Sequence, residues 1–262
     1  MKYLILGPGS MAIWSILGHV HRLHNEHKLD NLEEISGSSA GSLVAFVYSL
    51  GKQNTDKMIE KCFEINMGAF LNIRIKNFLK DYGLIAHDKI RNEISNYCFE
   101  STGLRDLTFK EHYELTKIKI HIPALSLDKQ INDYFSVDSS PNESIIDAIC
   151  MSISIPFIFS PYKNHLDGSI IESIPYIPFM DKDPEDVYAV RITYETVQKR
   201  FTSLQSYIGY ILGIFYILRR ESAVTYTTAC IDVSNSELFN FKMNKIDYYK
   251  LFLRGYSVNV QS

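Results

Sequence analysis

The fold is decided by one stretch of sequence, Glu33-Glu-Ile-Ser-Gly-Ser-Ser-Ala-Gly41, which reads as a short buried strand turning sharply into a helix. Its second half, Gly37-Ser38-Ser39-Ala40-Gly41, has the pattern G-x-S-x-G. A serine on such a turn needs very small neighbours at both glycine positions, and its hydroxyl then projects from the turn. The small, apolar residues 40–50 are typical of a helix, whose first N–H groups would face negative charge developing at Ser39. Ser39 is therefore the candidate nucleophile.

The preceding segment follows the same plan. Tyr3–Leu6 is a short apolar run ended by Gly7-Pro8-Gly9, and apolar residues then recur at helical spacing from Ile13 to Leu23. The chain thus begins strand, glycine loop, helix, strand, tight turn, helix, which predicts a parallel sheet with helices on both faces. The apolar start imitates a signal peptide, but the Gly-Pro-Gly interrupts it and no A-x-A site follows. We therefore expect a strand here.

The rest of the chain continues the alternation of strands and helices. Residues 54–100 look mainly helical and amphipathic, and 145–152 form a small-residue helix. The most apolar stretch, Leu204–Leu218, is shorter than the roughly 20 residues of a membrane span, so we expect a buried helix there, with an interfacial helix as the alternative. Further strands are predicted over residues 117–127, 134–137, 186–192 and 228–233, and one ends within 164–168.

Composition excludes several classes of protein. The chain has 262 residues, 46% hydrophobic and 22% charged, with a net charge of −3. These values exclude a disordered tail, a fibrous repeat and a polytopic membrane protein, and they give no basic field for nucleic acid. The four cysteines are too far apart for a metal or redox motif, so we expect buried thiols and a reducing compartment. We expect a solvated helix face, and no metal site, from His19, His21, His24 and His27.

A serine nucleophile needs a base, and two candidates share one short segment. In His165-Leu-Asp167-Gly168 the aspartate suits the carboxyl end of a strand, the edge where open α/β sheets bind ligands. Burial beside an apolar acyl pocket would raise its pKa above the usual ~3.9. His165, the last histidine, is the alternative, but only one strand precedes Ser39, whereas several do in common α/β-hydrolases. The acid partner of that histidine would be Asp128, Asp133, Asp138 or Asp147.

The glycine loop Gly7-Pro8-Gly9-Ser10 is the third element of the candidate site. Such a loop before a helix can present backbone N–H groups to a phosphate or an oxyanion. The dinucleotide fingerprint G-x-G-x-x-G fails at Ala12, and the Gly-Lys-Ser/Thr of a phosphate-binding loop is absent from the sequence.

Together these motifs resemble the patatin-like phospholipases over nearly the whole chain. The family's G-x-S-x-G matches Gly37–Gly41, and its D-G-[AG] matches Asp167-Gly168 with Ser169 in third place. Its stretch A-S-x-A-x-P-x-x-F matches residues 151–159, with Met151 and Ser154 in place of alanines. The resemblance implies one patatin-like domain over residues 1–262, an α/β fold built as a three-layer α/β/α sandwich around a mostly parallel central sheet.

The resemblance also implies a chemistry: a phospholipase A-type lipid acyl hydrolase with a Ser39–Asp167 dyad. Ser39 would attack an acyl ester, and Asp167 would take its proton and then activate water. No metal or organic cofactor is implied. Gly37 and Gly41 would form the nucleophile turn, Gly168 would follow the base, and the oxyanion would be bound by Gly7, Gly9, Ser10 and Ala40.

One motif departs from the family. The family's oxyanion loop resembles G-G-G-x-[KR]-G, whereas here Pro8 lacks an N–H, Met11 replaces the basic residue and Ala12 replaces the last glycine. Losing one oxyanion donor can lower the rate by about 10²–10³-fold. A catalytically impaired, lipid-binding homologue is therefore one alternative. An acyltransferase or a thioesterase using the same serine is another.

A lipid substrate requires contact with a membrane. The segment Met67–Leu84 mixes apolar side chains with Arg74, Lys76 and Lys80, so it is our candidate docking surface. The alternative is a helix packed on the core with a solvated basic face. We expect a lipid or phospholipid substrate, no nucleic acid partner, and a cytoplasmic or peripheral membrane location.

Overall fold

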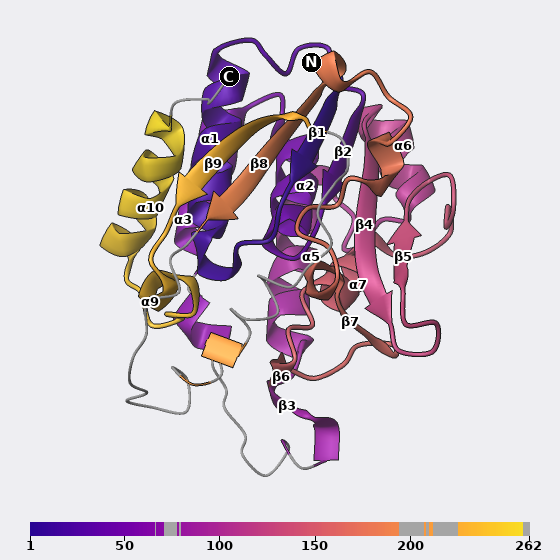
Figure 1. Cartoon of the computed structure of the whole chain (residues 1–262), viewed down its shortest axis with the longest axis vertical. Coiled ribbons are helices and arrows are strands. Elements are labelled where there is room, and N and C mark those ends of the chain that lie inside the picture. The colour runs from indigo at the N-terminus through magenta and orange to yellow at the C-terminus, as the bar shows by residue number, and fades with distance from the viewer. Residues whose placement is uncertain are drawn as a thin grey trace.

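The computed structural model describes residues 1–65, 67–70, 78, 80–193, 207, 210–211 and 225–258 (Figure 1). Its centre is a seven-stranded sheet in the order β5-β4-β2-β1-β8-β9, with β7 also paired to β4. The strands are β1 (Tyr3–Leu6), β2 (Glu34–Gly37), β4 (Lys119–Ser126), β5 (Asn132–Phe135), β7 (His165–Asp167), β8 (Val187–Thr193) and β9 (Thr227–Asp232).

The sheet is mostly parallel, as the sequence predicts. Strand β1 lies between β2 and β8, and all the pairings from β4 through β9 run parallel. Only β5 and β7 run antiparallel to β4. Leu4, Ile5 and Leu6 are wholly buried, which explains why the first strand is a continuous apolar run.

One face of the sheet is covered by a row of helices. Helix α1 lies beside α10 and α2, α2 also contacts α3 and α5, and α5 contacts α7 (Figure 1). Their bounds are α1 (Ile13–Asn25), α2 (Ala40–Gly51), α3 (Thr55–Glu64), α5 (Asp88–Thr102), α7 (Ile145–Ser152) and α10 (Lys245–Ser257). Helix α6 (Phe109–Thr116) contacts β4, and the short α9 (Asn235–Leu238) contacts the 3₁₀ turn Ser10–Ala12.

Helices α1 and α10 cross with their backbones in contact. A Cβ added to Gly18 would lie 2.1 Å from the carbonyl oxygen of Phe252, and one added to Gly255 would lie 1.8 Å from that of Ser15. No larger side chain fits at either position. Two glycines on different helices therefore set how closely the first and last helices of the described chain approach.

The opposite face is covered by the segment that follows β7. It contains short 3₁₀ turns at Gly168–Ile170, Ile177–Phe179 and Pro184–Asp186. Tyr176 and Phe179 pack there against Ile5 and Ala189 of the sheet. The expected mixed α/β fold, a mostly parallel central sheet flanked by helices, is thus confirmed.

Two sequence-based expectations about local structure need correction. Residues 54–100 are interrupted by β3 (Gly83–Ile85), which pairs in parallel with β6 (Phe157–Phe159) in a separate small sheet. His19 does not lie on a solvated face: it is buried, with Nδ1 3.1 Å from the Gly255 carbonyl oxygen and Nε2 2.9 Å from the Tyr188 hydroxyl. Both ring nitrogens of His19 have hydrogen-bond partners inside the protein, so this polar residue can be buried.

The cysteines are free and mostly buried, as the sequence predicts. Three of the four cysteines are buried and the fourth is partly buried, all as free thiols. Within the described ranges, no cluster of three histidine, cysteine or acidic side chains could hold a metal ion, and no helix is long and apolar enough to cross a membrane. The apolar stretch 204–218, except for residues 207, 210 and 211, lies outside the described residues.

Candidate active site

Ser39 occupies the turn between β2 and α2, with φ 53° and ψ −123°. A positive φ is strained for a residue with a side chain, and such strain concentrates at functional sites. The residue is 3% exposed. A Cβ on Gly41 would lie 2.2 Å from the Leu6 carbonyl oxygen, and one on Gly37 would lie 2.5 Å from that of Gly41. Both positions of the motif thus require glycine, because the backbone of Leu6 lies against Gly41 and the backbone of Gly41 lies against Gly37.

Asp167 is the last residue of β7 and is 1% exposed. Its Oδ1 accepts hydrogen bonds from the backbone N–H of Ser169, at 2.8 Å, and from the Ser169 hydroxyl, at 2.5 Å. A Cβ on the following Gly168 would lie 2.3 Å from the Pro123 carbonyl oxygen, so this position also requires glycine. The carboxylate is therefore held in one orientation inside the protein.

Strand pairing places the ends of β2 and β7 in line with each other. Both strands pair with β4 on the side away from β5. The pairing of β2 with β4 extends as far as Ser36, which lies opposite His121. The pairing of β7 with β4 ends at Asp167, which lies opposite Ala124. The two strands run toward each other and stop within a short stretch of β4. The carboxyl ends that carry Ser39 and Asp167 therefore meet.

The residues at the end of α7 bind both of these strand ends. The backbone N–H of Ser39 donates to the hydroxyl of Ser152, at 3.0 Å, and the N–H of Asp167 donates to the carbonyl oxygen of Ser154, also at 3.0 Å. A stretch of three residues thus fixes both candidate catalytic residues. Sequence reasoning noted Ser152 and Ser154 only as parts of a motif, because nothing in that motif indicates which backbone groups they contact.

A buried histidine supports the same stretch. The Ser154 hydroxyl donates to the Cys150 carbonyl oxygen, at 2.8 Å, and lies 3.1 Å from Nε2 of His87. Burial lowers the pKa of His87 to about 4, so the ring is neutral at pH 7. With the serine proton directed at Cys150, the His87 Nε2–H donates to Ser154. Sequence analysis missed His87, which carries no motif.

The glycine loop contributes fewer free N–H groups than expected. The Gly7 N–H donates to the Val190 carbonyl oxygen, at 2.9 Å, and so extends the β1–β8 pairing. Within the described part of the chain, the N–H groups of Gly9, Ser10 and Ala40 have no hydrogen-bond acceptor. Ala40 is the first residue of α2, where an unpaired N–H is normal.

The unusual residues of this loop have structural explanations. Met11 and Ala12 are wholly buried in the main core beneath α1. A basic side chain at position 11 would have to enter an apolar environment, which is costly without a partner. Ser10 adopts a positive φ of 44°. The sequence thus differs from the family loop at positions whose side chains face inward.

The alternative base His165 is held by other groups. Its Nδ1 lies 2.7 Å from the Lys163 carbonyl oxygen, and its Nε2 lies 3.3 Å from Oδ2 of Asp133. Asp133 also binds Lys129, at 2.8 Å. Burial alone would raise the pKa of Asp133, but the hydrogen bonds from Lys129 and His165 lower it. Both ring nitrogens of His165 therefore have partners other than Ser39.

A comparison with known families is decisive. Residues 4–180 match the model of the patatin-like phospholipases, and this range contains both Ser39 and Asp167. The chain belongs to the patatin-like phospholipase family. The membership covers β1 through the turn after β7, which includes every candidate residue named above.

Two viral proteins are similar in sequence. The chain is 26% identical over 183 residues to a probable lipid hydrolase, 463L, of Invertebrate iridescent virus 6, covering 66% of this chain and 61% of that protein. It is 24% identical over 238 residues to the uncharacterized protein R571 of Acanthamoeba polyphaga mimivirus, covering 86% of this chain and 78% of that protein.

Solved structures confirm the fold. VipD from Legionella pneumophila superposes with a TM-score of 0.61 at 16% identity, over 97% of this chain and 65% of that one. ExoU, solved with SpcU from the type III secretion system of Pseudomonas aeruginosa, gives 0.50 at 14% identity, over 98% of this chain and 50% of that one. The chain thus spans less than two thirds of the iridescent virus protein and of VipD.

Proposed function

We propose that this patatin-like domain is a lipid acyl hydrolase of the phospholipase A type, with Ser39 as nucleophile and Asp167 as base. The observation that supports it most is the meeting of β2 and β7 end to end on β4, with both residues bound to the Ser152–Ser154 stretch. Family membership and the similar probable lipid hydrolase point to the same substrate class.

The chemistry proceeds in two stages. The Ser39 Oγ attacks the ester carbonyl carbon while its proton moves to the Asp167 carboxylate. The tetrahedral oxyanion is stabilised by the N–H groups of Gly9, Ser10 and Ala40, which lie at the start of a helix. Collapse expels the alcohol, which takes the proton from Asp167, and leaves an acyl-serine. Water, activated by Asp167, then releases the fatty acid.

Labelling by a fluorophosphonate probe tests the nucleophile directly. The wild-type protein should be labelled at Ser39, and the Ser39→Ala variant should not. A folded wild-type protein that stays unlabelled and releases no fatty acid from phosphatidylcholine vesicles would contradict the proposal. It would favour an impaired homologue, for which Pro8 and Met11 of the glycine loop give a reason.

Two further variants distinguish the bases. Asp167→Asn should lower the rate of fatty-acid release by about 10²–10⁴-fold, because general-base catalysis contributes that much. His165→Ala, which removes a partly buried ring at the other end of the same strand, is the matched control and should retain turnover. Loss of turnover only in the histidine variant would replace the Ser–Asp dyad by a Ser–His pair. Transfer of the acyl group to an added alcohol or thiol in preference to water would indicate an acyltransferase.

We further propose peripheral contact with a lipid surface, now centred on the small β3–β6 sheet. Tyr82 is 70% exposed and Phe157 is 44% exposed, and Phe157 pairs with Gly83 beside Tyr82. The small sheet lies beyond the carboxyl ends of the main strands, where Ser39 also lies (Figure 1). Of the basic residues expected to help, Lys80 is exposed, and Arg74 and Lys76 lie outside the described residues.

A further inference from the structure

The hydroxyl of Ser169 lies against the carboxylate of Asp167. Ser169 is 4% exposed and belongs to the 3₁₀ turn Gly168–Ile170, directly after β7. Its hydroxyl donates to Asp167 Oδ1 at 2.5 Å, and its backbone N–H donates to the same oxygen at 2.8 Å. An O–H bond to a carboxylate is short, about 2.5–2.7 Å, and roughly twice as strong as a bond between neutral groups. One residue thus supplies two hydrogen bonds to the proposed base.

The side chain of Ser169 is a departure from the family's sequence pattern. In the D-G-[AG] pattern, glycine or alanine stands where this chain has Ser169, and neither of those residues carries a hydroxyl. Either residue would still offer the backbone N–H that Asp167 accepts at the start of the turn. This chain therefore has a side-chain donor to its proposed base in addition to the bond that the backbone supplies.

Burial and hydrogen bonding have opposite effects on the charge of Asp167. The residue is 1% exposed, and burial raises the pKa of a carboxyl because it disfavours the anion. Hydrogen bonds donated to the carboxylate lower the pKa, because protonation makes its oxygens weaker acceptors. A general base must be ionised before it can accept a proton. The balance of these two effects therefore sets the lowest pH at which Asp167 can act.

Other titratable groups lie on the elements packed around Asp167. Within the described part of the chain they are Lys119 and His121 on β4, Asp133 and Tyr134 on β5, Asp147 and Cys150 on α7, His87 at the start of α5, and His165 and Glu172 on its own segment. All of these groups remain when only residue 169 is replaced. Their effects on the charge of Asp167 therefore cancel when such a variant is compared with the wild type.

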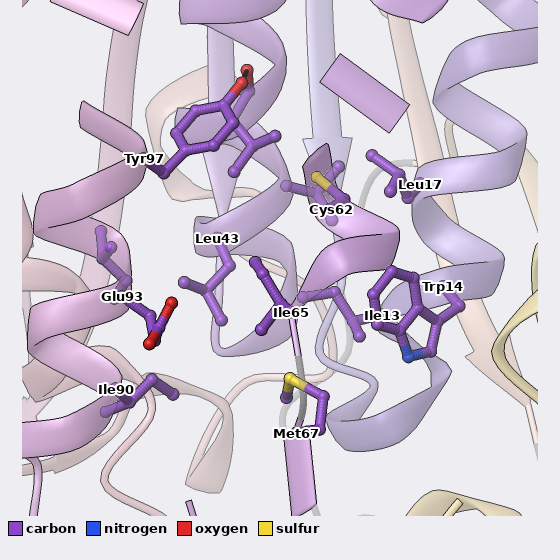
Figure 2. Close-up of a pocket in the computed structure, with 13 residues that line it drawn as sticks. Ile13, Trp14, Leu17, Leu43, Cys62, Ile65, Met67, Ile90, Glu93 and Tyr97 are labelled. Carbon is purple, nitrogen blue, oxygen red and sulfur yellow. Dashed lines mark hydrogen bonds between the residues drawn. The ribbon is translucent and has the colours of Figure 1, made fainter. Parts of the chain in front are cut away.

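The surroundings of Asp167 are separate from the small apolar pocket between α1, α2, α3 and α5 (Figure 2). Among the described residues that line this pocket, none belongs to β7 or to the turn that carries Ser39. Its one carboxylate, that of Glu93, is on an exposed residue of α5. The polar groups that control the charge of Asp167 are therefore those of β4, α7 and its own segment, which includes Ser169.

We propose that Ser169 is a positioning residue that keeps Asp167 ionised, and that its hydroxyl sets the lower pH limit of the reaction. Ser169 acts through Asp167 and keeps its own proton, while the proton of Ser39 passes to Asp167 and then to the leaving alcohol. Without this hydroxyl the effect of burial dominates, and the carboxyl titrates near about pH 5 instead of at or below its usual ~3.9. This inference rests on the proposed hydrolase function and adds to it the residue that adjusts the base.

The charge of Asp167 can be measured by NMR without any catalysis. In protein labelled with carbon-13 at the aspartate carboxyls, the signal of Asp167 is the one that disappears in Asp167→Asn. In Ser169→Ala this signal should titrate about one to two pH units higher than in the wild type, because one hydrogen bond to a charged group is lost. The fluorescence of Trp14, the only tryptophan of the chain, shows at each pH that the protein is folded.

Ser36→Ala is the matched control. Ser36 is also buried, and its hydroxyl donates to the carbonyl oxygen of Pro175, at 2.6 Å, and not to a carboxylate. This variant should lose a buried hydrogen bond as Ser169→Ala does, but Asp167 should titrate as in the wild type. The proposal is wrong if Asp167 titrates at one pH in all three proteins, if Ser36→Ala shifts it equally, or if Asp167 stays ionised in Ser169→Ala down to the pH of unfolding.

Labelling of Ser39 by a fluorophosphonate at a series of pH values separates this inference from the proposed catalysis. In Ser169→Ala the labelling rate should fall about tenfold per pH unit below about pH 5, and near pH 8 it should stay within about threefold of the wild type, since the N–H of residue 169 still holds Oδ1. A shifted carboxyl titration in a protein that is never labelled would support the role of Ser169 and refute the catalysis. Labelling with the same pH dependence in both proteins would refute the role of Ser169 and keep the catalysis.

Discussion

At the scale of single residues, the backbone conformation of Ser39 opposes stability but suits the role proposed for its hydroxyl. Its backbone lies in a region that glycine adopts freely and other residues adopt at a cost of about 1–3 kcal/mol. The flanking glycines cannot relieve this strain, since they are needed for the close approach of Leu6 and Gly41. The conformation that exposes the hydroxyl at the turn therefore lowers the stability of the folded state.

Replacing the proposed nucleophile by glycine should accordingly stabilise the protein and abolish the proposed hydrolysis. Ser39→Gly removes the strain but adds chain entropy to the unfolded state, which offsets about 0.4–1 kcal/mol. We expect the free energy of unfolding to exceed that of Ser39→Ala by about 1 kcal/mol in urea titrations. The alanine variant is the control, since it also lacks the hydroxyl but keeps the side-chain strain. Equal stability of the two would show that the turn is relaxed.

At the scale of elements, the small β3–β6 sheet combines exposure with strain. Both Tyr82 and Phe157 have positive φ angles, of 57° and 68°, which is unusual for bulky side chains. Aromatic rings favour the interface between water and lipid, where one end is apolar and the other is wet. The two exposed rings therefore suit the proposed anchor, which would hold the carboxyl ends of the main strands near a membrane.

Removing an aromatic ring from this proposed anchor should weaken membrane binding. Phe157→Ser should reduce co-sedimentation with phosphatidylcholine vesicles severalfold, because it removes apolar area from the contact. Hydrolysis of a short-chain ester in solution should change little, since Phe157 is exposed and outside the candidate site. Leu115→Ser, which also replaces an exposed apolar side chain by serine but on α6, serves as the control. If both variants bind vesicles like the wild type, the small sheet is not the docking surface.

Regular periodicity explains which elements the sequence could predict. The runs at Tyr3–Leu6 and Ile145–Ser152 have clear patterns and form the expected strand and helix. Strands β3 and β6 have three residues each, too few to show a period, and were missed. Helix α10 was also missed, although its buried residues fall at helical spacing, because the exposed apolar residues Ile246, Tyr249 and Leu253 obscure that pattern.

Only part of the candidate site could likewise be predicted from the sequence. Ser39 and Asp167 were predicted because local motifs mark them, and the strand ends that carry them come together in the structure. The contacts of Ser152, the position of His87 and the engagement of the Gly7 N–H depend on how strands and α7 pack. No local pattern contains that information.

At the scale of the whole molecule, buried histidines should make stability depend on pH. Burial lowers the pKa of both His87 and His112 to about 4, whereas an unfolded histidine titrates near 6.5. The unfolded state therefore binds more protons between these values. Stability is fully present above pH 6.5 and is lost as the pH falls toward 4, by up to about 1.4 kcal/mol per pH unit for each histidine.

His112→Gln isolates one of these contributions. The amide can still bind Ser49, which lies 2.8 Å from the His112 Nε2, but it does not titrate. Urea unfolding between about pH 7.5 and pH 5 should show a smaller loss of stability than in the wild type. His27→Gln, which changes an exposed histidine, should leave the wild-type dependence intact. A dependence on pH that is the same in all three proteins would contradict the assignment.

Because α1 packs against α10 at a crossing of two glycines, α1 stays uncovered during most of the synthesis of the chain. Helix α1 ends at Asn25, but the helix that covers it begins only at Lys245. Until those last residues emerge, the growing polypeptide carries Gly18 and Trp14 without Phe252 and Tyr248 against them. A nascent chain stalled before Lys245 should therefore be a client for chaperones that hold apolar surfaces.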